Sequence, residues 1–342
     1  MPISHPFDSP PAAGVAFPVA PGIAWLRMPL PFALDHINLW LLDDGPASVA
    51  VDAGIALDAV RDAWKSALAG RRLTRQIVTH FHPDHLGLAA WLEAETGAPL
   101  WMSQGDYLTA QAVAAGLPPF DIPTLVTFFR RHGLDAAGCE ALDRRGNAYR
   151  RGVPAIPDSF RRLREGDSLV IGGRHWRVIV GHGHAPEHVS LYCEALRVLI
   201  SGDMLLPRIS TNISVFAACP DDDSLGDFLA SLERLKMLPA DTLVLPSHGL
   251  PFRGVHERIA QLRDHHAVRC ADLCAACGTR PASAAELIPT LFGRPIADAH
   301  QIMFAMGEAI AHLNHLERQG LVRRVTEDGV IRYASPHDNK PD

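Results

Sequence analysis

Residues 79–87, THFHPDHLG, hold four potential metal ligands within six positions, namely His80, His82, Asp84 and His85. Histidine is the commonest metal ligand in proteins. Because alternate residues of an extended segment project to the same side, His80 and His82 can face one point. Asp84 and His85 fall on the turn into the next helix and can face a second point. Burying four such groups without a metal would be costly, so the spacing predicts two metal ions about 3.5–4 Å apart, as in two-metal hydrolases.

Three further candidate ligands lie downstream, each at the end of a predicted strand. They are His184 in GHGHAPEHVSL, Asp203 in LISGDML and His248 in LVLPSHG. The first of these motifs also contains His182 and His188, and the residue types leave open which histidine binds. An Asp in Ser-Gly-Asp is equally compatible with a turn, because its side chain can bond to its own backbone there. The residues alone therefore predict a metal centre whose complete ligand set stays open.

Buried strands must hold these ligands, and the hydrophobic pattern predicts them on both sides of the first motif. An apolar strand at 76–78 runs directly into residue 79, and a helix is expected over 86–96. Further strands are expected at 23–28, 36–42, 48–52, near 100, and at 168–171, 175–180, 189–193, 198–201 and 242–245. Further helices are expected at 57–69, 104–115, 224–237 and 254–276. Strands mixed with helices in this order predict an α/β fold.

Composition divides the chain further. Residues 117–165 hold nine Arg against six acidic residues, a local net charge of +3 that indicates an insertion rather than core. The last sixty residues are expected to form a helix, a second helix and a two-stranded hairpin, the element order of a small winged-helix module. The predicted parts are an extended arm at 1–22, a main domain at 23–278 containing the insertion, a winged-helix-like domain at 279–335 and a tail at 336–342.

The overall composition excludes several classes of protein. With 47% hydrophobic and 20% charged residues, the chain can bury a sizeable core and is not disordered. Its 32 basic and 38 acidic residues give a net charge of −6, which argues against a protein that coats nucleic acid or anionic membrane. No apolar run approaches the roughly 20 residues of a membrane span, and the start shows no secretory pattern. Six cysteines form no disulfide framework, so the expected location is the cytoplasm.

The ordered motifs resemble the metallo-β-lactamase superfamily over roughly residues 22–275. The match consists of H-x-H-x-D-H at 80–85 followed by His184, Asp203 and His248, and VDAG at 51–54 resembles the first motif of the family. This resemblance implies an αββα sandwich with the metals at one edge between two sheets. It implies that Asp52 supports the site, and that His188 is no ligand. Glu187 departs from the family, which has Gly there.

The resemblance also implies a division of the ligands between the metals. His80, His82 and His184 would bind the first metal, Asp84, His85 and His248 would bind the second, and Asp203 would bridge both. A bridging carboxylate is typical of the hydroxyacylglutathione hydrolases, lactonases, ribonucleases and phosphodiesterases rather than the true β-lactamases. His/Asp sites favour two zinc ions, and iron or manganese remains an alternative.

The expected activity is that of a dinuclear metal-dependent hydrolase. A hydroxide bridging the metals would attack an ester-type bond, a thioester or lactone, with Asp84 orienting it and taking its proton. The alternatives are a phosphodiesterase or endoribonuclease and, more remotely, a non-catalytic binding protein. Residues 280–335 carry six Arg, no Lys and six acidic residues, which favours a packing role for the C-terminal module over binding of nucleic acid.

The substrate and the partners are less well defined by the sequence. A small-molecule substrate is expected, with no membrane partner, and a homodimer is one open possibility. One hypothesis is that the insertion caps the active site and selects an anionic carrier such as coenzyme A, with phenylalanines forming an apolar wall and arginines facing an acidic group. The alternative is that it is a solvated, arginine-rich surface loop. The candidate substrate residues are Phe128, Phe129, Arg130, Arg131 and Arg208. The spacing of Cys270, Cys274 and Cys277 is that of a radical-SAM cluster motif. These cysteines are nevertheless expected on one helix face that contacts the core.

Overall fold

The computed structural model describes residues 1–296 and 298–336, which form two compact units. The first unit comprises residues 1–114, 148–211 and 231–259. The second comprises residues 115–147, 212–230, 260–296 and 298–336. Residues 337–342 of the predicted tail lie outside the described residues. Within the described part of the chain, no helix is both long enough and apolar enough to cross a membrane.

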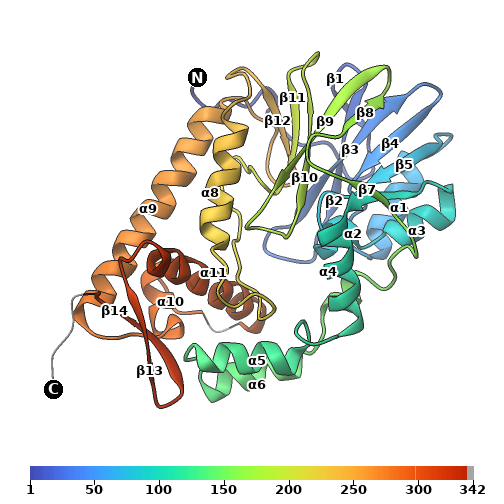
Figure 1. Cartoon of the computed structure of the whole chain (residues 1–342). Helices are drawn as coiled ribbons and strands as arrows, with labels where there is room; N and C mark the ends of the chain where they lie inside the picture. The colour runs from blue at the N-terminus through green and yellow to red at the C-terminus, as the bar shows by residue number, and fades with distance from the viewer. Residues whose placement is uncertain (297, 337–342) are drawn as a thin grey trace. The chain divides into compact units, whose positions relative to one another are not determined.

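A seven-stranded sheet forms one half of the first unit (Figure 1). The strands lie in chain order: the first four are antiparallel neighbours, and the pairs from β4 to β7 are parallel. They are β1 (Phe17–Ala20), β2 (Ile23–Pro29), β3 (His36–Asp44), β4 (Ala47–Val51), β5 (Leu73–Ile77), β6 (Leu100–Ser103) and β7 (Arg161–Leu163). Thus the predicted N-terminal arm contributes edge strand β1, and residues 161–163 of the predicted insertion contribute edge strand β7.

A five-stranded sheet forms the other half, in the order β12-β11-β10-β9-β8. Its pairs are antiparallel except β11 with β12, which is parallel and therefore needs a crossover through helix α8. The elements are β8 (Ser168–Ile171), β9 (Arg174–Gly181), β10 (His188–Cys193), β11 (Val198–Gly202), α8 (Ser224–Leu235) and β12 (Leu243–Pro246).

The core of the first unit lies between the two sheets. It is built of apolar side chains from both, including Trp25, Trp40 and Trp176, which are at most 1% exposed. Burial of about 25 cal/mol per Å² of apolar surface makes such a layer the main source of stability. Helices cover the outer faces: α1 (Asp58–Ala67) packs on β2 and α3 (Ala89–Thr96) on β5, while Arg234 of α8 bonds to β9. The predicted αββα sandwich is confirmed.

The helix predicted over 86–96 is divided into two helices. Helix α2 (Pro83–Leu86) ends at Leu86, and α3 begins at Ala89. Gly87 lies between them, and a Cβ atom there would approach the carbonyl oxygen of Gly152 to 2.3 Å. Glycine is required because the backbone of the short helix α7 (Tyr149–Gly152) passes so close. This close approach fixes the end of the ligand-bearing segment.

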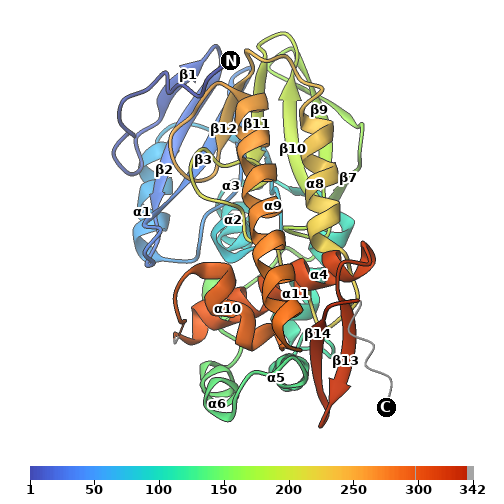
Figure 2. The ribbon, with the colours of Figure 1, turned by 90° about the vertical axis from the view of Figure 1, so that its left-hand side faces the viewer.

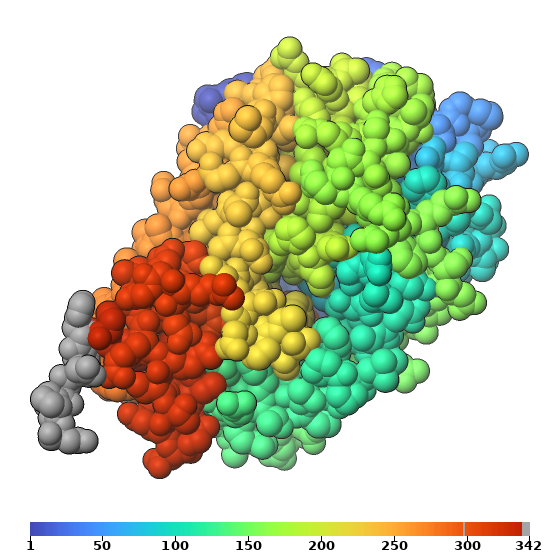
Figure 3. Space-filling model, viewed as in Figure 1, coloured from blue at the N-terminus to red at the C-terminus, as the bar shows by residue number. Residues whose placement is uncertain are grey.

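The second unit is largely helical. It contains α5 (Ile122–Arg131), α6 (Ala136–Arg145), most of α9 (Val255–Thr279), α10 (Ala284–Phe292), α11 (Ala299–Arg318) and the hairpin β13 (Arg323–Glu327) and β14 (Val330–Ala334), while α4 (Gln104–Ala115) ends at its border. Helices α8 and α9 run side by side (Figure 2), with Phe228 packing against His266. Figure 3 shows the C-terminal residues in red beside the yellow segment near 220, where Asn314 donates to the carbonyls of Pro220 and Asp222.

Candidate metal centre

The seven predicted ligands come together at the ends of four strands of the first unit. His80 follows β5, His184 follows β9, Asp203 follows β11 and His248 follows β12. Asp84 and His85 lie in α2, where Pro83 stands at the first helical position because its missing N–H and fixed φ suit that place. The donor atoms form two groups, each with all atoms within 4.8 Å of one another: His80, His82, His184 and Asp203, and Asp84, His85 and His248.

Asp203 lies between the two groups. Its Oδ2 is 3.5 Å from Nε2 of His184, in the first group. Its Oδ1 is 3.6 Å from Nε2 of His85 and 3.4 Å from Nε2 of His248, in the second group. Each carboxylate oxygen therefore faces a different group, as a ligand bridging two ions must. The first group is also compact, with Nε2 of His80 2.9 Å from Nδ1 of His82 and 3.2 Å from Nε2 of His184.

Hydrogen bonds on the far side of the rings fix their orientation. Nδ1 of His85 donates to Oδ2 of Asp52 at 2.8 Å, and Nδ1 of His248 donates to the carbonyl oxygen of His36 at 2.8 Å. The hydroxyl of Thr79 donates to Asp52 at 3.0 Å and accepts from Nδ1 of His80 at 3.0 Å. All three rings consequently present Nε2 to the centre and bond through Nδ1 to a protein oxygen, as metal-binding histidines usually do with the ring nitrogen that does not bind the metal.

Two buried atoms at the centre lack a hydrogen-bond partner among the described residues. They are Nε2 of His85 and Oδ1 of Asp203. Buried polar atoms are nearly always paired, and an imidazole lone pair beside a carboxylate oxygen is a donor set for a divalent cation. The residues therefore fit the divalent metals that the fold and its His/Asp groups indicate.

The histidines of the centre differ in the direction in which their surroundings shift their pKa values. Burial and the neighbouring His184 lower the pKa of His82 to about 3. For His248, burial lowers the pKa, but Asp203 and Asp84 outweigh it and raise the pKa to about 10. For Asp84, burial opposes ionisation, yet the nearby His85 and His248 lower its pKa to about 2. The carboxylates are thus ionised at neutral pH and attract positive charge into the second group.

The two other histidines of the motif at 181–191, His182 and His188, bond to the backbone around the site. Nδ1 of His182 bonds to the carbonyl of Pro186 at 2.7 Å. His188 is fully buried, and its Nε2 accepts from the backbone N–H of Asp203 at 3.0 Å. Glu187, the departure from the family pattern, accepts from the N–H of Gly105 at 2.7 Å and so caps the start of α4. His184 is therefore the member of this motif that joins the donor group.

Asp106 is a supporting residue for which the sequence analysis found no signal. This fully buried carboxylate accepts from the N–H of Phe81 at 2.9 Å and of Glu187 at 2.8 Å, and so ties together the loops of three donors of the first group. Burial outweighs these bonds and raises its pKa to about 6. An acidic residue at the first turn of a helix is too common for its long-range partners to be recognised from the sequence.

The predicted substrate residues are distributed over both units. Phe128 and Phe129, expected to form an apolar wall, are 8% and 1% exposed and pack inside the second unit, because helix α5 turns them to its buried face. Arg130 and Arg131 are exposed at the end of the same helix. Arg208 is exposed in the first unit, five positions after Asp203.

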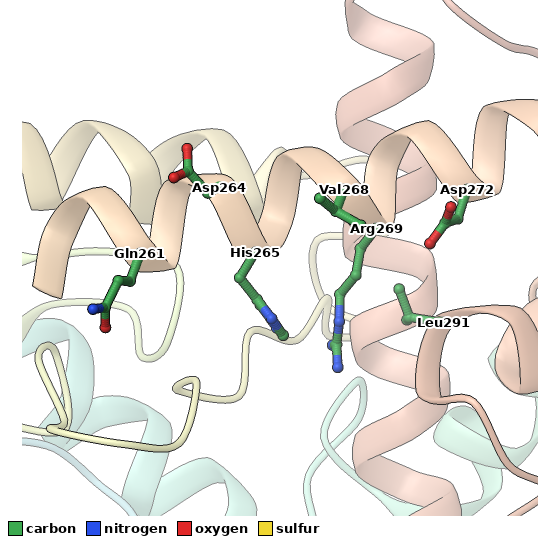
Figure 4. A pocket seen from close by; sticks show the side chains of 7 residues that line it. All are labelled: Gln261, Asp264, His265, Val268, Arg269, Asp272 and Leu291. Carbon is green, nitrogen blue, oxygen red and sulfur yellow. The ribbon is translucent and has the colours of Figure 1, made fainter.

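A pocket of about 510 Å³ lies in the second unit, and none of the predicted ligands lines it. Figure 4 shows Gln261, His265 and Arg269 along one side of α9, with Leu291 of α10 nearby. Arg269 pairs with Glu308 at 2.8 Å, and Asp264 and Asp272 flank it, so the pocket lacks the positive charge of an anion site. On the same helix, Cys277 is buried whereas Cys270 and Cys274 are half-buried, and no cysteine joins a metal-binding group among the described residues.

A sandwich of two sheets with clustered His and Asp at the strand ends defines a class of metal-dependent hydrolases. The sequence profile described as "Metallo-beta-lactamase superfamily" matches residues 33–248, and that of "Metallo-beta-lactamase-like, C-terminal domain" matches residues 270–336. The chain belongs to the metallo-beta-lactamase superfamily and is a metallo-hydrolase.

Solved structures and curated proteins resemble nearly the whole chain. A beta-lactamase domain protein from Burkholderia ambifaria is 49% identical with a TM-score of 0.91, over 97% of this chain and 98% of that one. The metallo-beta-lactamase family protein TTHA1429 from Thermus thermophilus is 30% identical with a TM-score of 0.77, over 92% and 98%. The probable metallo-hydrolase YqjP of Bacillus subtilis is 25% identical, over 90% of this chain and 96% of its own.

The names of some relatives specify a substrate. The acyl-coenzyme A thioesterase MBLAC2 of Gallus gallus is 25% identical, over 73% of this chain and 84% of its own. A hydroxyacylglutathione hydrolase of Fuscovulum blasticum is 27% identical, over 63% and 67%.

Proposed function

We propose that the chain is a dinuclear metal-dependent hydrolase of an ester-type bond, a thioester or a lactone. His80, His82 and His184 hold one divalent ion, Asp84, His85 and His248 hold the second, and Asp203 bridges them. The observation that carries this proposal is the position of Asp203, whose two carboxylate oxygens face the two donor groups at 3.4–3.6 Å. A structural Asp in a turn would have no need of two separate imidazole groups around its oxygens.

The side chains divide the work of hydrolysis. Two divalent ions supply Lewis acidity and lower the pKa of a water molecule from near 16 to about 7 when bound. Asp84, with 20% of its side chain exposed, is more accessible than the buried histidines. Its carboxylate is ionised at neutral pH, so it can orient the attacking water and accept its proton. Asp52 and Thr79 hold His85 and His80 in place while the charge of the site changes.

Zinc is the proposed metal. Imidazole nitrogen and carboxylate oxygen are ordinary zinc ligands, and the same donors accept iron or manganese. Metal analysis of protein purified without added metal, followed by reconstitution with each ion, distinguishes the three.

The proposed substrate is an acyl thioester on an anionic carrier. The support is the thioesterase and hydroxyacylglutathione hydrolase names of relatives and the exposed cation Arg208, five positions after Asp203 in the chain. Arg258 is 6% exposed and donates to the carbonyls of Leu206 at 2.6 Å and Ile209 at 2.8 Å. It thereby fixes the loop that carries Arg208. Arg130 and Arg131 remain proposed contacts, and a homodimer and a cytoplasmic location remain predictions.

A substrate screen tests this function. Metal-reconstituted protein is assayed with acyl-CoA and glutathione thioesters, lactones, bis(p-nitrophenyl) phosphate and single-stranded RNA, in parallel with Asp203→Asn and with Asp62→Asn, an exposed control in α1. We expect turnover of thioesters or lactones that only Asp203→Asn abolishes. Cleavage confined to RNA or the phosphodiester would replace the proposal by a phosphodiesterase. Absence of turnover on every substrate, with a bound partner retained by Asp203→Asn, would indicate a binding protein.

A further inference from the structure

The start of β3 holds the loop that carries His248. The buried side chain of Asn38 donates through Nδ2 to the carbonyls of Pro246 at 2.9 Å and Gly249 at 2.7 Å. The backbone N–H of Asn38 donates to the carbonyl of Ser247 at 2.7 Å. One residue of the seven-stranded sheet therefore bonds to three of the four residues at 246–249, which follow β12 of the five-stranded sheet.

The orientation of the Asn38 amide is unambiguous. Nε1 of Trp25, a group that can only donate, lies 2.8 Å from Oδ1 of Asn38. The oxygen must therefore face Trp25 and the NH₂ group must face the two carbonyls. The side chain is fully buried, so water cannot replace these bonds if they are lost, and leaving two carbonyls unsatisfied is costly.

His36 completes the clamp formed by residues 36 and 38. Its carbonyl oxygen accepts from Nδ1 of His248, and its Nε2 accepts from the N–H of Gly249 at 2.9 Å. Nδ1 of His36 donates to Asp35 at 2.8 Å, which fixes the tautomer with Nε2 as an acceptor. The clamp thus binds every residue from 246 to 249, including the ring of the metal ligand.

We propose that Asn38 is a positioning residue for His248, so that it sets the affinity of the second metal without contacting either ion; this rests on the proposed function. In Asn38→Asp, the carboxylate still accepts from Trp25 but points an acceptor at two carbonyls, which repels the loop. Side chains that orient ligands in this way typically contribute 10–100-fold to metal affinity. We expect a loss of roughly that size for the second metal and no loss for the first.

The experiment is competition of the zinc-loaded, full-length protein with a chromophoric chelator, which resolves the two dissociation steps. The matched control is Gln76→Glu. Gln76 is equally buried in the same sheet, and its Nε2 donates to two carbonyls, those of Ala89 at 2.8 Å and Ala98 at 3.1 Å. It bonds to no residue of 246–249, so Gln76→Glu is expected to lose stability but to keep both zinc affinities.

A double-variant cycle tests whether Asn38 acts through His248. In the His248→Ala background, Asn38→Asp is expected to weaken zinc binding no further. Equal losses in both backgrounds, or unchanged zinc affinity in Asn38→Asp, would overturn the inference while leaving the proposed function intact. Wild-type protein that binds no metal would instead overturn both this inference and the proposed function. If Asn38→Asp does not fold, His36→Leu is the second variant, which removes the acceptor for Gly249 and the bond to Asp35 but keeps the backbone carbonyl that holds His248. It is expected to weaken the second zinc about tenfold; unchanged affinity there also overturns the inference.

Discussion

The imidazole of His188 and the backbone of Asp203 are joined by a hydrogen bond of 3.0 Å, from the N–H of Asp203 to Nε2 of His188. The ring reaches this position because residue 202 is glycine. Gly202 has φ of +53°, and a Cβ atom there would lie 2.4 Å from two atoms of the His188 ring. The geometry of Asp203, the proposed bridging carboxylate, therefore depends on Gly202 and His188, neither of which is a proposed ligand.

Gly202→Ala is expected to reduce zinc binding and turnover as well as the free energy of unfolding. The left-handed φ alone costs about 1–2 kcal/mol in a non-glycine residue, and the clash with His188 adds roughly 1–3 kcal/mol and displaces Asp203. The measurement is urea unfolding together with zinc content and turnover. Gly45→Ala is the control, because Gly45 has φ of +68° with nothing within 4 Å of the added atom. Equal effects of the two variants would show that the contact with His188 has no importance.

Asp52→Asn is expected to lower zinc affinity roughly 10–100-fold while the backbone stays in place. Asp52 has φ of +65°, a conformation that Asn also tolerates. The amide cannot accept from the Thr79 N–H, the Thr79 hydroxyl and His85 together with the strength of a carboxylate. Chelator competition and circular dichroism check the two parts. Wild-type zinc affinity in Asp52→Asn would contradict the support role of Asp52.

Arg208→Ala is expected to raise KM for an acyl-CoA thioester roughly tenfold and to leave kcat nearly unchanged, because a charge-assisted contact to the carrier is lost in ground and transition states alike. Steady-state kinetics with the thioester and with an uncharged lactone separate this effect from damage to the site. The lactone is expected to show wild-type constants. The same assay applies to the double variant Arg130→Ala, Arg131→Ala. Unchanged KM for the thioester would remove the respective arginines from substrate binding.

Glu308 predicts a pH dependence of stability in the second unit. It is 5% exposed in α11, and burial outweighs the facing Arg269 and Asn212 and raises its pKa to about 7 from 4.5. Glu308 therefore holds its proton more tightly in the folded than in the unfolded state. Its contribution to the free energy of unfolding is complete below pH 4.5 and is lost as the pH rises through 7. Relative to Glu308→Gln, wild type is expected to lose roughly 2–3 kcal/mol between pH 5 and 8. The measurement is urea unfolding of both proteins at pH 5 and pH 8. The same difference in free energy of unfolding between wild type and Glu308→Gln at both pH values would contradict this prediction.

The local part of the candidate metal centre is predictable from sequence because four of its proposed ligands lie within six residues. His184 is different: its motif contains three histidines, and only the path of the chain after β9 decides which ring faces Asp203. The β-strands of the core are also readable, since continuous apolar runs such as that of β3 can be buried on both faces.

The supporting residues are not predictable in this way. Asn38 and its partner Pro246 are 208 positions apart, and an isolated Asn in an apolar strand gives no sign of where its amide points. The phenylalanines of α5 illustrate the opposite error, because aromatic residues near an Arg pair resemble a binding surface until the phase of the helix is known. Asp121 caps that helix by accepting from the N–H of Thr124, and the phase that follows turns Phe128 and Phe129 inward.

A zinc titration of the chelator-treated protein tests the dinuclear centre most directly. Bound zinc is measured by elemental analysis, while thioester hydrolysis is followed at each step of the titration. We predict that wild type binds two equivalents, that turnover is absent without metal and complete at two, and that Asp203→Asn binds fewer than two and stays inactive. Full turnover by metal-free protein, or saturation of wild type at a single equivalent, would contradict a centre in which Asp203 joins two ions.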